Sequence, residues 1–285
     1  MFSRVLTKDA KAVEVEVLSA YLEMFPKGDP SFVPAVFGWA SDYFGGRYQD
    51  YQAIDASYHD EEHTMQGTLC MVRLLCGRHH AGVEPRLTEH MLQLGILAIL
   101  LHDSGYLKKR DDTEGTGAKY TVTHVSRSAD FSEVILGEKG YSATDIRAVQ
   151  NMIFCTGINA NVATIPFQSE LERVVGYALG TGDLLGQMAA EDYVEKLPIL
   201  YEEFAEATRY TEDRKQFIVT FNSPAELLHR TPAFWEGFVK PKLEKDFEGV
   251  YQYLNRPYPD GANEYVRHVE ANIDRLRRGL VAVLV

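Results

Sequence analysis

Residues 88–103 read TEHMLQLGILAILLHD. Between a polar start and the final pair His102-Asp103, this stretch is almost wholly apolar. A helix that is apolar nearly all round belongs in the middle of a core. Thr88 has the side chain that is typical of an N-cap. The stretch therefore predicts a buried helix that ends on an imidazole and a carboxylate.

The residue patterns on either side of this stretch also predict mostly helices. Two polar segments, 26–34 and 108–122, predict loops, and the second is glycine-rich and expected at the surface. Valine-rich alternation is too scarce for a sheet of any size. Helices are predicted over 10–24, from His59 to about Cys76, after the capping boxes at Ser142 and Ser169, and after Ser223-Pro224.

These patterns give an all-α fold in a single domain over 1–285. We expect a helical core at about 55–200 and a helical C-terminal extension at about 201–285. The length of 285 residues is ample for a buried core.

The composition bears on which binding partners and which cellular compartment we expect. The net charge of -12 argues against a nucleic acid polymer as a partner, but a phosphorylated small molecule stays open if a metal ion supplies positive charge. No stretch approaches the roughly 20 apolar residues of a membrane span, and the charged N-terminal segment is unlike a signal peptide. Three cysteines without a pairing pattern predict reduced thiols, so we expect a cytoplasmic protein without a membrane partner.

Several histidines and aspartates stand next to strongly apolar sequence. A buried carboxylate is costly unless it is paired or binds a metal, and imidazole with carboxylate is the usual ligand set for a catalytic divalent ion. Asp183, within GTGDLLGQM, shares a helix face with apolar residues and is out of place there unless something compensates its charge. The candidates are His59, His63, His102, Asp103, His124 and Asp183.

The order of these residues resembles the HD-domain metal-dependent phosphohydrolases over roughly residues 55–200. The segment from Tyr58-His59 to His63 also resembles the cyclic-nucleotide phosphodiesterase branch. The resemblance implies an HD-type helical bundle and a divalent ion, Mg²⁺, Mn²⁺, Fe²⁺, Ni²⁺ or Zn²⁺. It implies that His63, His102, Asp103 and Asp183 ligate one ion, that Asp103 bridges to a second ion near His124, and that His59 protonates the leaving oxygen.

One departure from the family leaves the number of ions open. Many two-metal members carry a further histidine on the following helix, where this chain has Cys155 and its neighbours. A buried structural cysteine is more common than a ligating one. One ion and two ions both stay open, and so does a contribution from Cys155.

The chemistry of phosphate ester hydrolysis fits these residue types. A metal ion polarises a phosphoryl oxygen and lowers the pKa of bound water to about 7. His59, Asp103 and His124 are the candidates for catalysis, because an imidazole can donate or accept a proton near neutral pH. Lys108, Lys119 and Arg127 are the candidates for holding phosphate oxygens. In contrast, Arg78, His79, His80 and His90 are expected at the surface without a function.

The sequence therefore predicts a metal-dependent phosphohydrolase that acts on a small phosphorylated metabolite or nucleotide, with a cyclic phosphodiester as a serious option. Two alternatives stay open. One is a di-iron oxygenase on the same helical scaffold, which needs six protein ligands around two irons. The other is a non-catalytic nucleotide-binding sensor. The substrate, the metal and the oligomeric state, a homodimer among them, are not marked by any residue pattern.

Overall fold

The structure of the protein is a computed structural model that describes residues 2–157, 160–211 and 221–282. The fold is all-α, as the sequence predicted, and the strands in these ranges form a single short antiparallel pair, β1 (Asn255–Arg256) and β2 (Ala262–Asn263). The helices are α1 (Ala10–Met24), α2 (Phe32–Phe44), α3 (Glu61–Ala81), α4 (Glu89–Leu101), α5 (His124–Glu138), α6 (Ala143–Ile153), α7 (Glu170–Met188), α8 (Tyr193–Tyr210), α9 (Pro224–Phe234) and α10 (Glu264–Ala282).

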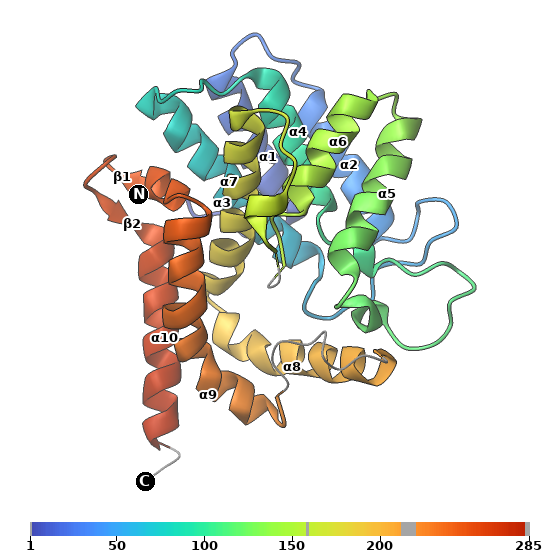
Figure 1. The fold of residues 1–285 in the computed structure, drawn as a ribbon, viewed down its shortest axis with the longest axis vertical. Coiled ribbons are helices and arrows are strands. Elements are labelled where there is room, and N and C mark those ends of the chain that lie inside the picture. The colour runs from blue at the N-terminus through green and yellow to red at the C-terminus, as the bar shows by residue number, and fades with distance from the viewer. Residues whose placement is uncertain (1, 158–159, 212–220, 283–285) are drawn as a thin grey trace.

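Helices α3, α4 and α7 form the centre of the molecule (Figure 1). Helix α3 packs most extensively against α7, and α4 contacts both of them as well as α2, α5 and α6. Every residue of α4 from Leu94 to Leu101 is buried, which confirms the prediction of a core helix. The buried apolar side chains form one cluster that extends from Val13 in α1 to Leu276 in α10.

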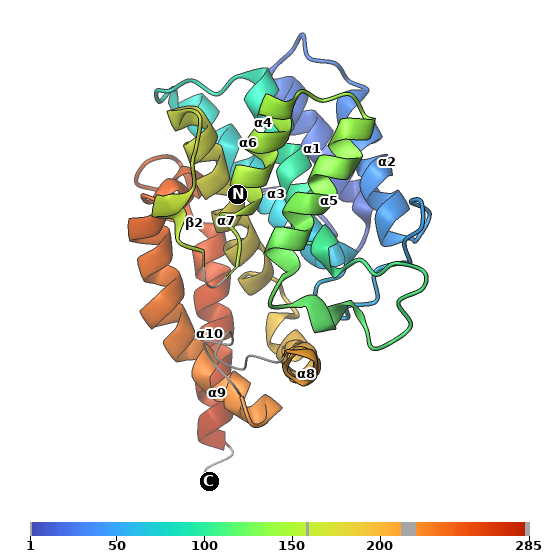
Figure 2. The same ribbon diagram turned by 45° about the vertical axis from the view of Figure 1, so that its right-hand side comes forward.

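The other helices surround this centre. Helices α1 and α2 pack on α3 and α4, and α5 and α6 cover α4 from another side. In Figures 1 and 2, α9 and α10 run side by side along one edge of the molecule, and α8 crosses beneath the central helices. Helix α8 contacts α9, α10 and the 3₁₀ turn Gly117–Tyr120, so the C-terminal part packs directly against the segment that precedes α5.

The predicted helix starts are confirmed at four positions. Thr88 accepts a hydrogen bond from the backbone N–H of Met91, and three serines accept equivalent bonds at the starts of α6, α7 and α9. Each bond satisfies a backbone donor that the helix itself leaves without a partner. The serines are Ser142, Ser169 and Ser223.

Other predicted boundaries were wrong. Helix α2 begins at Phe32, inside the segment predicted as a loop, because proline at position 34 is tolerated in a first helical turn. Helix α3 continues to Ala81 and ends at Gly82, which adopts the left-handed conformation that favours glycine. Arg78 was expected at the surface but is 2% exposed, since its guanidinium donates to the Pro85 carbonyl oxygen.

The segment 108–122 is only partly the surface loop that was predicted. Residues 109–115 are exposed or half-buried, but Lys108, Gly117 and Ala118 are buried. No helix in the described part of the chain combines the length and the apolar character needed to cross a membrane.

Candidate metal centre

Four of the predicted metal ligands meet in the interior from three helices. His63 lies in the first turn of α3, His102 and Asp103 directly follow α4, and Asp183 lies in α7. The side chains of His63, His102 and Asp103 are at most 4% exposed, and that of Asp183 is 12% exposed. The Asp60 carboxylate accepts a hydrogen bond from the backbone N–H of His63 at 2.8 Å and so sets the start of α3.

The two imidazoles face the same two carboxylate oxygens. The Nε2 atom of His63 is 3.1 Å from Asp103 Oδ2 and 3.3 Å from Asp183 Oδ1. The Nε2 atom of His102 is 3.2 Å and 3.7 Å from the same two oxygens. Ligands held at about 2.0–2.1 Å in a tetrahedron lie roughly 3.4 Å apart, so each of these four imidazole-to-carboxylate distances suits two ligands of one ion.

The orientation of two rings is set by backbone carbonyl groups. His102 Nδ1–H donates to the Ile99 carbonyl oxygen at 2.7 Å, and His124 Nδ1–H donates to the Thr121 carbonyl oxygen at 2.6 Å. Such bonds usually orient a metal-ligating histidine and leave Nε2 for the ion. His124 Nε2 is 3.8 Å from Asp103 Oδ1. Asp103 therefore presents one oxygen to His63 and His102 and the other to His124.

Three atoms of the cluster are buried without a hydrogen-bond partner among the described residues: His63 Nδ1, His102 Nε2 and Asp103 Oδ2. Buried polar atoms are almost always paired, because leaving one without a partner costs about 1–3 kcal/mol. For His102 and Asp103, coordination of an ion would supply the missing partner. Two imidazoles and two carboxylates also match the ligand preferences of a divalent transition ion. The buried His/Asp cluster can therefore hold a metal ion.

The negative charges of the two carboxylates in the cluster also favour a bound cation. Burial lowers the pKa of His63, but the neighbouring carboxylates of Asp103 and Asp183 outweigh it and raise that pKa to about 9. The pKa of His102 is raised well above its ordinary value against burial, chiefly by the charge of Asp103. Burial raises the pKa of both carboxyl groups, yet the two rings hold both pKa values below the ordinary value. Both carboxylates stay ionised, and protons on the rings or a metal ion must balance them.

Glycines allow α3 and α7 to approach closely enough to form the cluster. A Cβ atom on Gly186 would lie 2.6 Å from the Gln66 carbonyl oxygen, and one on Gly182 would lie 2.9 Å from the Gly67 carbonyl oxygen. Real side chains do not approach a backbone so closely, so any larger residue would push the helices apart. The glycines on either side of Asp183 thus bring its carboxylate to His63.

A third glycine brings His124 to the cluster. A Cβ atom on Gly105 would lie 2.0 Å from the His124 carbonyl oxygen. The Gly105 backbone N–H donates to Ser128 Oγ at 2.8 Å, which ties the turn after Asp103 to the first turns of α5. The first residue of α5 is therefore packed directly on the turn that carries His102 and Asp103.

His59 lies next to the cluster and is held by a buried carboxylate. One ring nitrogen of His59 lies within 4.8 Å of ligand atoms of His63 and Asp103. Its Nδ1 atom is 2.5 Å from Glu203 Oε2, and Glu203 Oε1 accepts the backbone N–H of Tyr58 at 2.7 Å. Burial raises the pKa of Glu203, but the neighbouring His59 ring and these hydrogen bonds outweigh it and lower the pKa. This pairing leaves Nε2 of His59 as the nitrogen that is free for proton transfer.

Three residues at the site were missed by sequence reasoning. Glu203 comes from α8, where it shares the buried face with Leu197 and Ala207; an acidic residue on an apolar helix face was the signal available. Tyr106 is fully buried, and its ring stacks on both His59 and His124 at centroid distances of 4.6 Å and 4.9 Å.

Gln187 is the third missed residue and links the Asp183 carboxylate to the Tyr58 hydroxyl. Its amide nitrogen donates to Asp183 Oδ1 at 3.2 Å, and its amide oxygen accepts the hydroxyl of Tyr58 at 2.8 Å. Gln187 stands one turn after Asp183 on α7, so helical spacing was the signal available.

Comparison with known proteins places the chain in a family. A family model described as Npun_R2479-like matches residues 15–273. The chain belongs to the Npun_R2479-like family. The matched span includes the whole His/Asp cluster as well as His59, His124 and Glu203. No curated protein matches the chain.

The three cations predicted to hold phosphate are engaged elsewhere in this Npun_R2479-like protein. Lys108 Nζ donates to the Gly115 carbonyl oxygen at 2.7 Å and lies 2.8 Å from Asp55 Oδ2. Arg127 donates to the Gly105 and Leu107 carbonyl oxygens, both at 2.7 Å.

Lys119 is the third of these cations. Its Nζ atom forms an ion pair with the carboxylate of Asp112 and donates to the Glu114 carbonyl oxygen at 2.6 Å. The structure thus uses all three side chains to hold the segment before α5. A role for them in phosphate binding stays a prediction.

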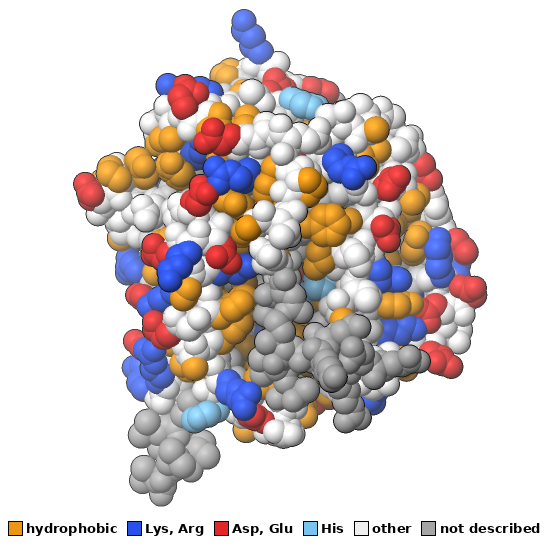
Figure 3. Space-filling model, viewed as in Figure 1, with side chains coloured by type: hydrophobic (Ala, Val, Ile, Leu, Met, Phe, Trp, Pro, Cys, Tyr) orange, Lys and Arg blue, Asp and Glu red, His pale blue; other side chains and the backbone are white. Residues whose placement is uncertain are grey.

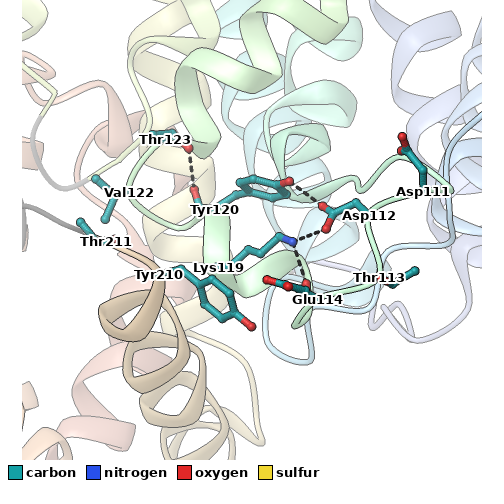
Figure 4. A pocket seen from close by; sticks show the side chains of 10 residues that line it. All are labelled: Asp111, Asp112, Thr113, Glu114, Lys119, Tyr120, Val122, Thr123, Tyr210 and Thr211. Atoms are coloured by element: carbon teal, nitrogen blue, oxygen red, sulfur yellow. Dashed lines mark hydrogen bonds and ion pairs between the residues drawn. The ribbon is translucent and has the colours of Figure 1, made fainter.

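A pocket of about 760 Å³ lies on the outer side of this segment (Figure 4). Lys119 points into it between Asp112 and Glu114, and Tyr120 and Tyr210 flank it from the loop and from α8. Thr123, which precedes His124, also lines it. With Lys119 already paired and three carboxylates in its lining, the pocket suits a phosphate group poorly.

Two further expectations concern residues outside the cluster. Cys155 is buried, and its thiol bonds to the Asn151 carbonyl oxygen at 3.7 Å; none of the candidate ligand groups among the described residues includes it. Charges of both signs are interspersed on the face in Figure 3 rather than gathered in one basic patch.

Proposed function

We propose that the protein is a metal-dependent phosphohydrolase of the HD type. The observation that carries the proposal is the buried convergence of His63, His102, Asp103 and Asp183, with ligand atoms that lack hydrogen-bond partners among the residues that the structure describes. The order of these residues along the chain supports the assignment to the HD-domain phosphohydrolases. The substrate class is a small phosphorylated metabolite or nucleotide, and a cyclic phosphodiester is included.

The proposed roles follow from the positions of the residues. His63, His102, Asp103 and Asp183 would hold one divalent ion, and Asp103 with His124 would hold a second. A bound ion supplies Lewis acidity at the phosphoryl group and lowers the pKa of water. It would also supply the positive charge that Lys108, Lys119 and Arg127 do not offer in this structure.

His59 would protonate the leaving oxygen, and Glu203 would be its positioning residue. Glu203 accepts Nδ1–H of His59 and two backbone N–H groups, so the carboxylate fixes both the ring and the turn before α3. A carboxylate on Nδ1 fixes the orientation of the ring, and in the imidazolium form Nε2–H would be the proton that is transferred. Tyr106 stacks on the ring and limits its rotation.

The test is metal content together with hydrolysis. We expect one or two ions per chain by mass spectrometry of untagged protein, and hydrolysis of a model phosphomonoester or phosphodiester that a chelator abolishes and added Mn²⁺ restores. His102→Ala should lose hydrolysis and the metal bound at the His/Asp cluster, while His268→Ala on the exposed side of α10 should retain both. Wild-type protein that is loaded with metal but hydrolyses neither substrate would contradict the proposal.

A di-iron oxygenase is the second candidate, and one observation favours it. The structure brings six candidate ligands together, because His59 and His124 join the four residues of the His/Asp cluster. Six protein ligands around two irons are what that chemistry requires. Two irons per chain with substrate-dependent oxygen consumption would support this function over hydrolysis.

A further inference from the structure

A second group of metal-ligating side chains lies at the other end of α3. Cys76 and His80 stand four residues apart and therefore share one face of the helix. Glu23, near the end of α1, faces them across the contact between α1 and α3. Cys76 comes thirteen positions after His63 in the same helix, which places this group about 20 Å from the His/Asp cluster.

The distances in this group suit a single ion. The Cys76 Sγ atom is 3.6 Å from His80 Nδ1, and one candidate ligand atom from each of the three side chains lies within 4.8 Å of the others. Sulfur at about 2.3 Å and nitrogen at about 2.0–2.1 Å from a tetrahedral zinc ion are about 3.6 Å apart. The spacing of Cys76 and His80 is therefore the spacing of two ligands of one such ion.

The group is also accessible, unlike the His/Asp cluster. The side chains of His80 and Glu23 are 46% and 60% exposed, and Cys76 is 7% exposed. His80 Nε2 is 3.3 Å from Glu23 Oε1, so the carboxylate is already at the imidazole. An exposed glutamate can rotate from the ring to an ion held between the thiolate and the imidazole.

We propose that Cys76, His80 and Glu23 form a second metal site, which takes a thiophilic divalent ion such as Zn²⁺ and joins α1 to α3. Thiolate, imidazole and carboxylate together prefer zinc over magnesium or calcium, because those harder ions bind oxygen ligands. Water completes the coordination on the exposed side. Binding replaces the thiol proton, which is released to solvent.

Cobalt is the probe that separates this site from the His/Asp cluster. Co²⁺ bound by a thiolate gives a near-ultraviolet charge-transfer absorption, and Co²⁺ bound by histidine and aspartate alone does not. We expect wild-type protein, dialysed against a chelator and titrated with Co²⁺, to develop that absorption and to lose it when Zn²⁺ is added. His102→Ala should keep the absorption, so the result does not depend on the proposed hydrolase site.

Matched variants assign the ligands. Cys76→Ser and His80→Ala should each abolish the absorption, and Glu23→Gln should raise the Co²⁺ dissociation constant at least about tenfold, since loss of even an outer-shell partner costs that much. His79→Ala and Cys155→Ser are the controls and should leave it unchanged. His80 is exposed, so His80→Ala reports on binding without a folding defect. Wild-type protein without the absorption in excess Co²⁺, or an absorption that survives both Cys76→Ser and His80→Ala, would overturn the proposal.

Discussion

Polar side chains lie in or near the interior in two regions, the His/Asp cluster and the segment from Lys108 to Arg127. The two regions differ in whether these side chains have hydrogen-bond partners. In the segment, Lys108, Lys119 and Arg127 each donate to backbone carbonyl oxygens, and both lysines also pair with aspartates. In the cluster, two ring nitrogens and a carboxylate oxygen are buried without a hydrogen-bond partner in the described part of the chain.

The comparison separates polar groups that are paired within the fold from polar groups that could bind a ligand. Paired groups contribute to stability, so removing one should lower the free energy of unfolding and leave chemistry intact. Unpaired buried groups cost stability, and proteins retain them where a bound ion or substrate completes them. The predictions below test this difference, from the largest expected effect to the smallest.

Asp103→Ala should abolish both metal binding at the His/Asp cluster and turnover. Asp103 faces His63 and His102 with one oxygen and His124 with the other, so its loss removes a ligand from both parts of the cluster. The measurements are metal content by mass spectrometry and the rate of phosphoester hydrolysis. Asp130→Ala, on an exposed position of α5, is the control. Full metal content in Asp103→Ala would defeat the assignment of the cluster.

His59→Ala should keep the metal but slow hydrolysis by about 10²–10⁴-fold for substrates with a poor leaving group. Its Nδ1 atom is held by Glu203, so the ring is positioned for proton transfer. Glu203→Gln should act in the same direction with a smaller effect. Rates are compared between good and poor leaving groups, with the exposed His229→Ala as control. Equal rates in wild type and variant would remove His59 from the mechanism.

Gly186→Ala should weaken metal binding and destabilise the protein by about 1–3 kcal/mol through overpacking. The added Cβ would lie 2.6–2.8 Å from backbone atoms of Gln66 and Gly67, so α7 must move away from α3 and carry Asp183 with it. Gly137→Ala is the matched control, because a Cβ there meets nothing within 4 Å. Denaturant unfolding and metal titration measure the two effects. An unchanged metal affinity would show that the close crossing is not needed for the site.

Metal binding at pH 7 should release protons. Burial lowers the pKa of His63, but Asp103 and Asp183 raise it to about 9, so the ring is protonated at pH 7 in the metal-free protein. A ligating imidazole must be neutral, so binding expels that proton, and the metal affinity should rise with pH up to about 9. Calorimetry in buffers of different ionisation enthalpy counts the protons. Binding without any buffer dependence would count against His63 as a ligand.

Lys108→Met should have the smallest effect, a loss of about 1–2 kcal/mol in the free energy of unfolding with metal content unchanged. Lys108 is buried and bonded to the Gly115 carbonyl oxygen and to Asp55, so its contribution is to the fold. Lys109→Met, at an exposed position, is the control. If Lys108→Met instead left stability unchanged and raised the KM for a phosphorylated substrate, Lys108 would belong to the substrate site.

Local signals in the sequence predicted most of the helices. Capping residues such as Thr88 and Ser169 act through hydrogen bonds within a few residues, so they can be read without knowing the fold. The missed helix α2 carries proline in its first turn, where the ring replaces an N–H that has no partner anyway. That position makes the same residue a loop signal in one context and a helix start in another.

The candidate site was predicted where a polar residue interrupts apolar sequence. His102, Asp103 and Asp183 stand out in this way, because burial of a charge is costly without compensation. No sequence pattern placed Glu203 or Tyr106 beside His59, because both residues reach it from segments far apart in the chain. The expected exposure of Lys108 at the surface was wrong. A lysine in a polar run looks solvated in the sequence, and only the fold brings Asp55 to it.

The sequence by itself therefore determined the all-α class, the capped helix starts, the buried α4 and the identity of the residues that converge on its end. Those features depend on periodicity, on capping within one turn and on the cost of isolated buried charge. Only the tertiary structure decided which polar groups are paired and which are left for a ligand. That outcome depends on how closely α3 and α7 cross at Gly182 and Gly186, and on the packing of α8 against the turn before α3. Both contacts join segments that are far apart in the chain, so no local stretch of sequence encodes them.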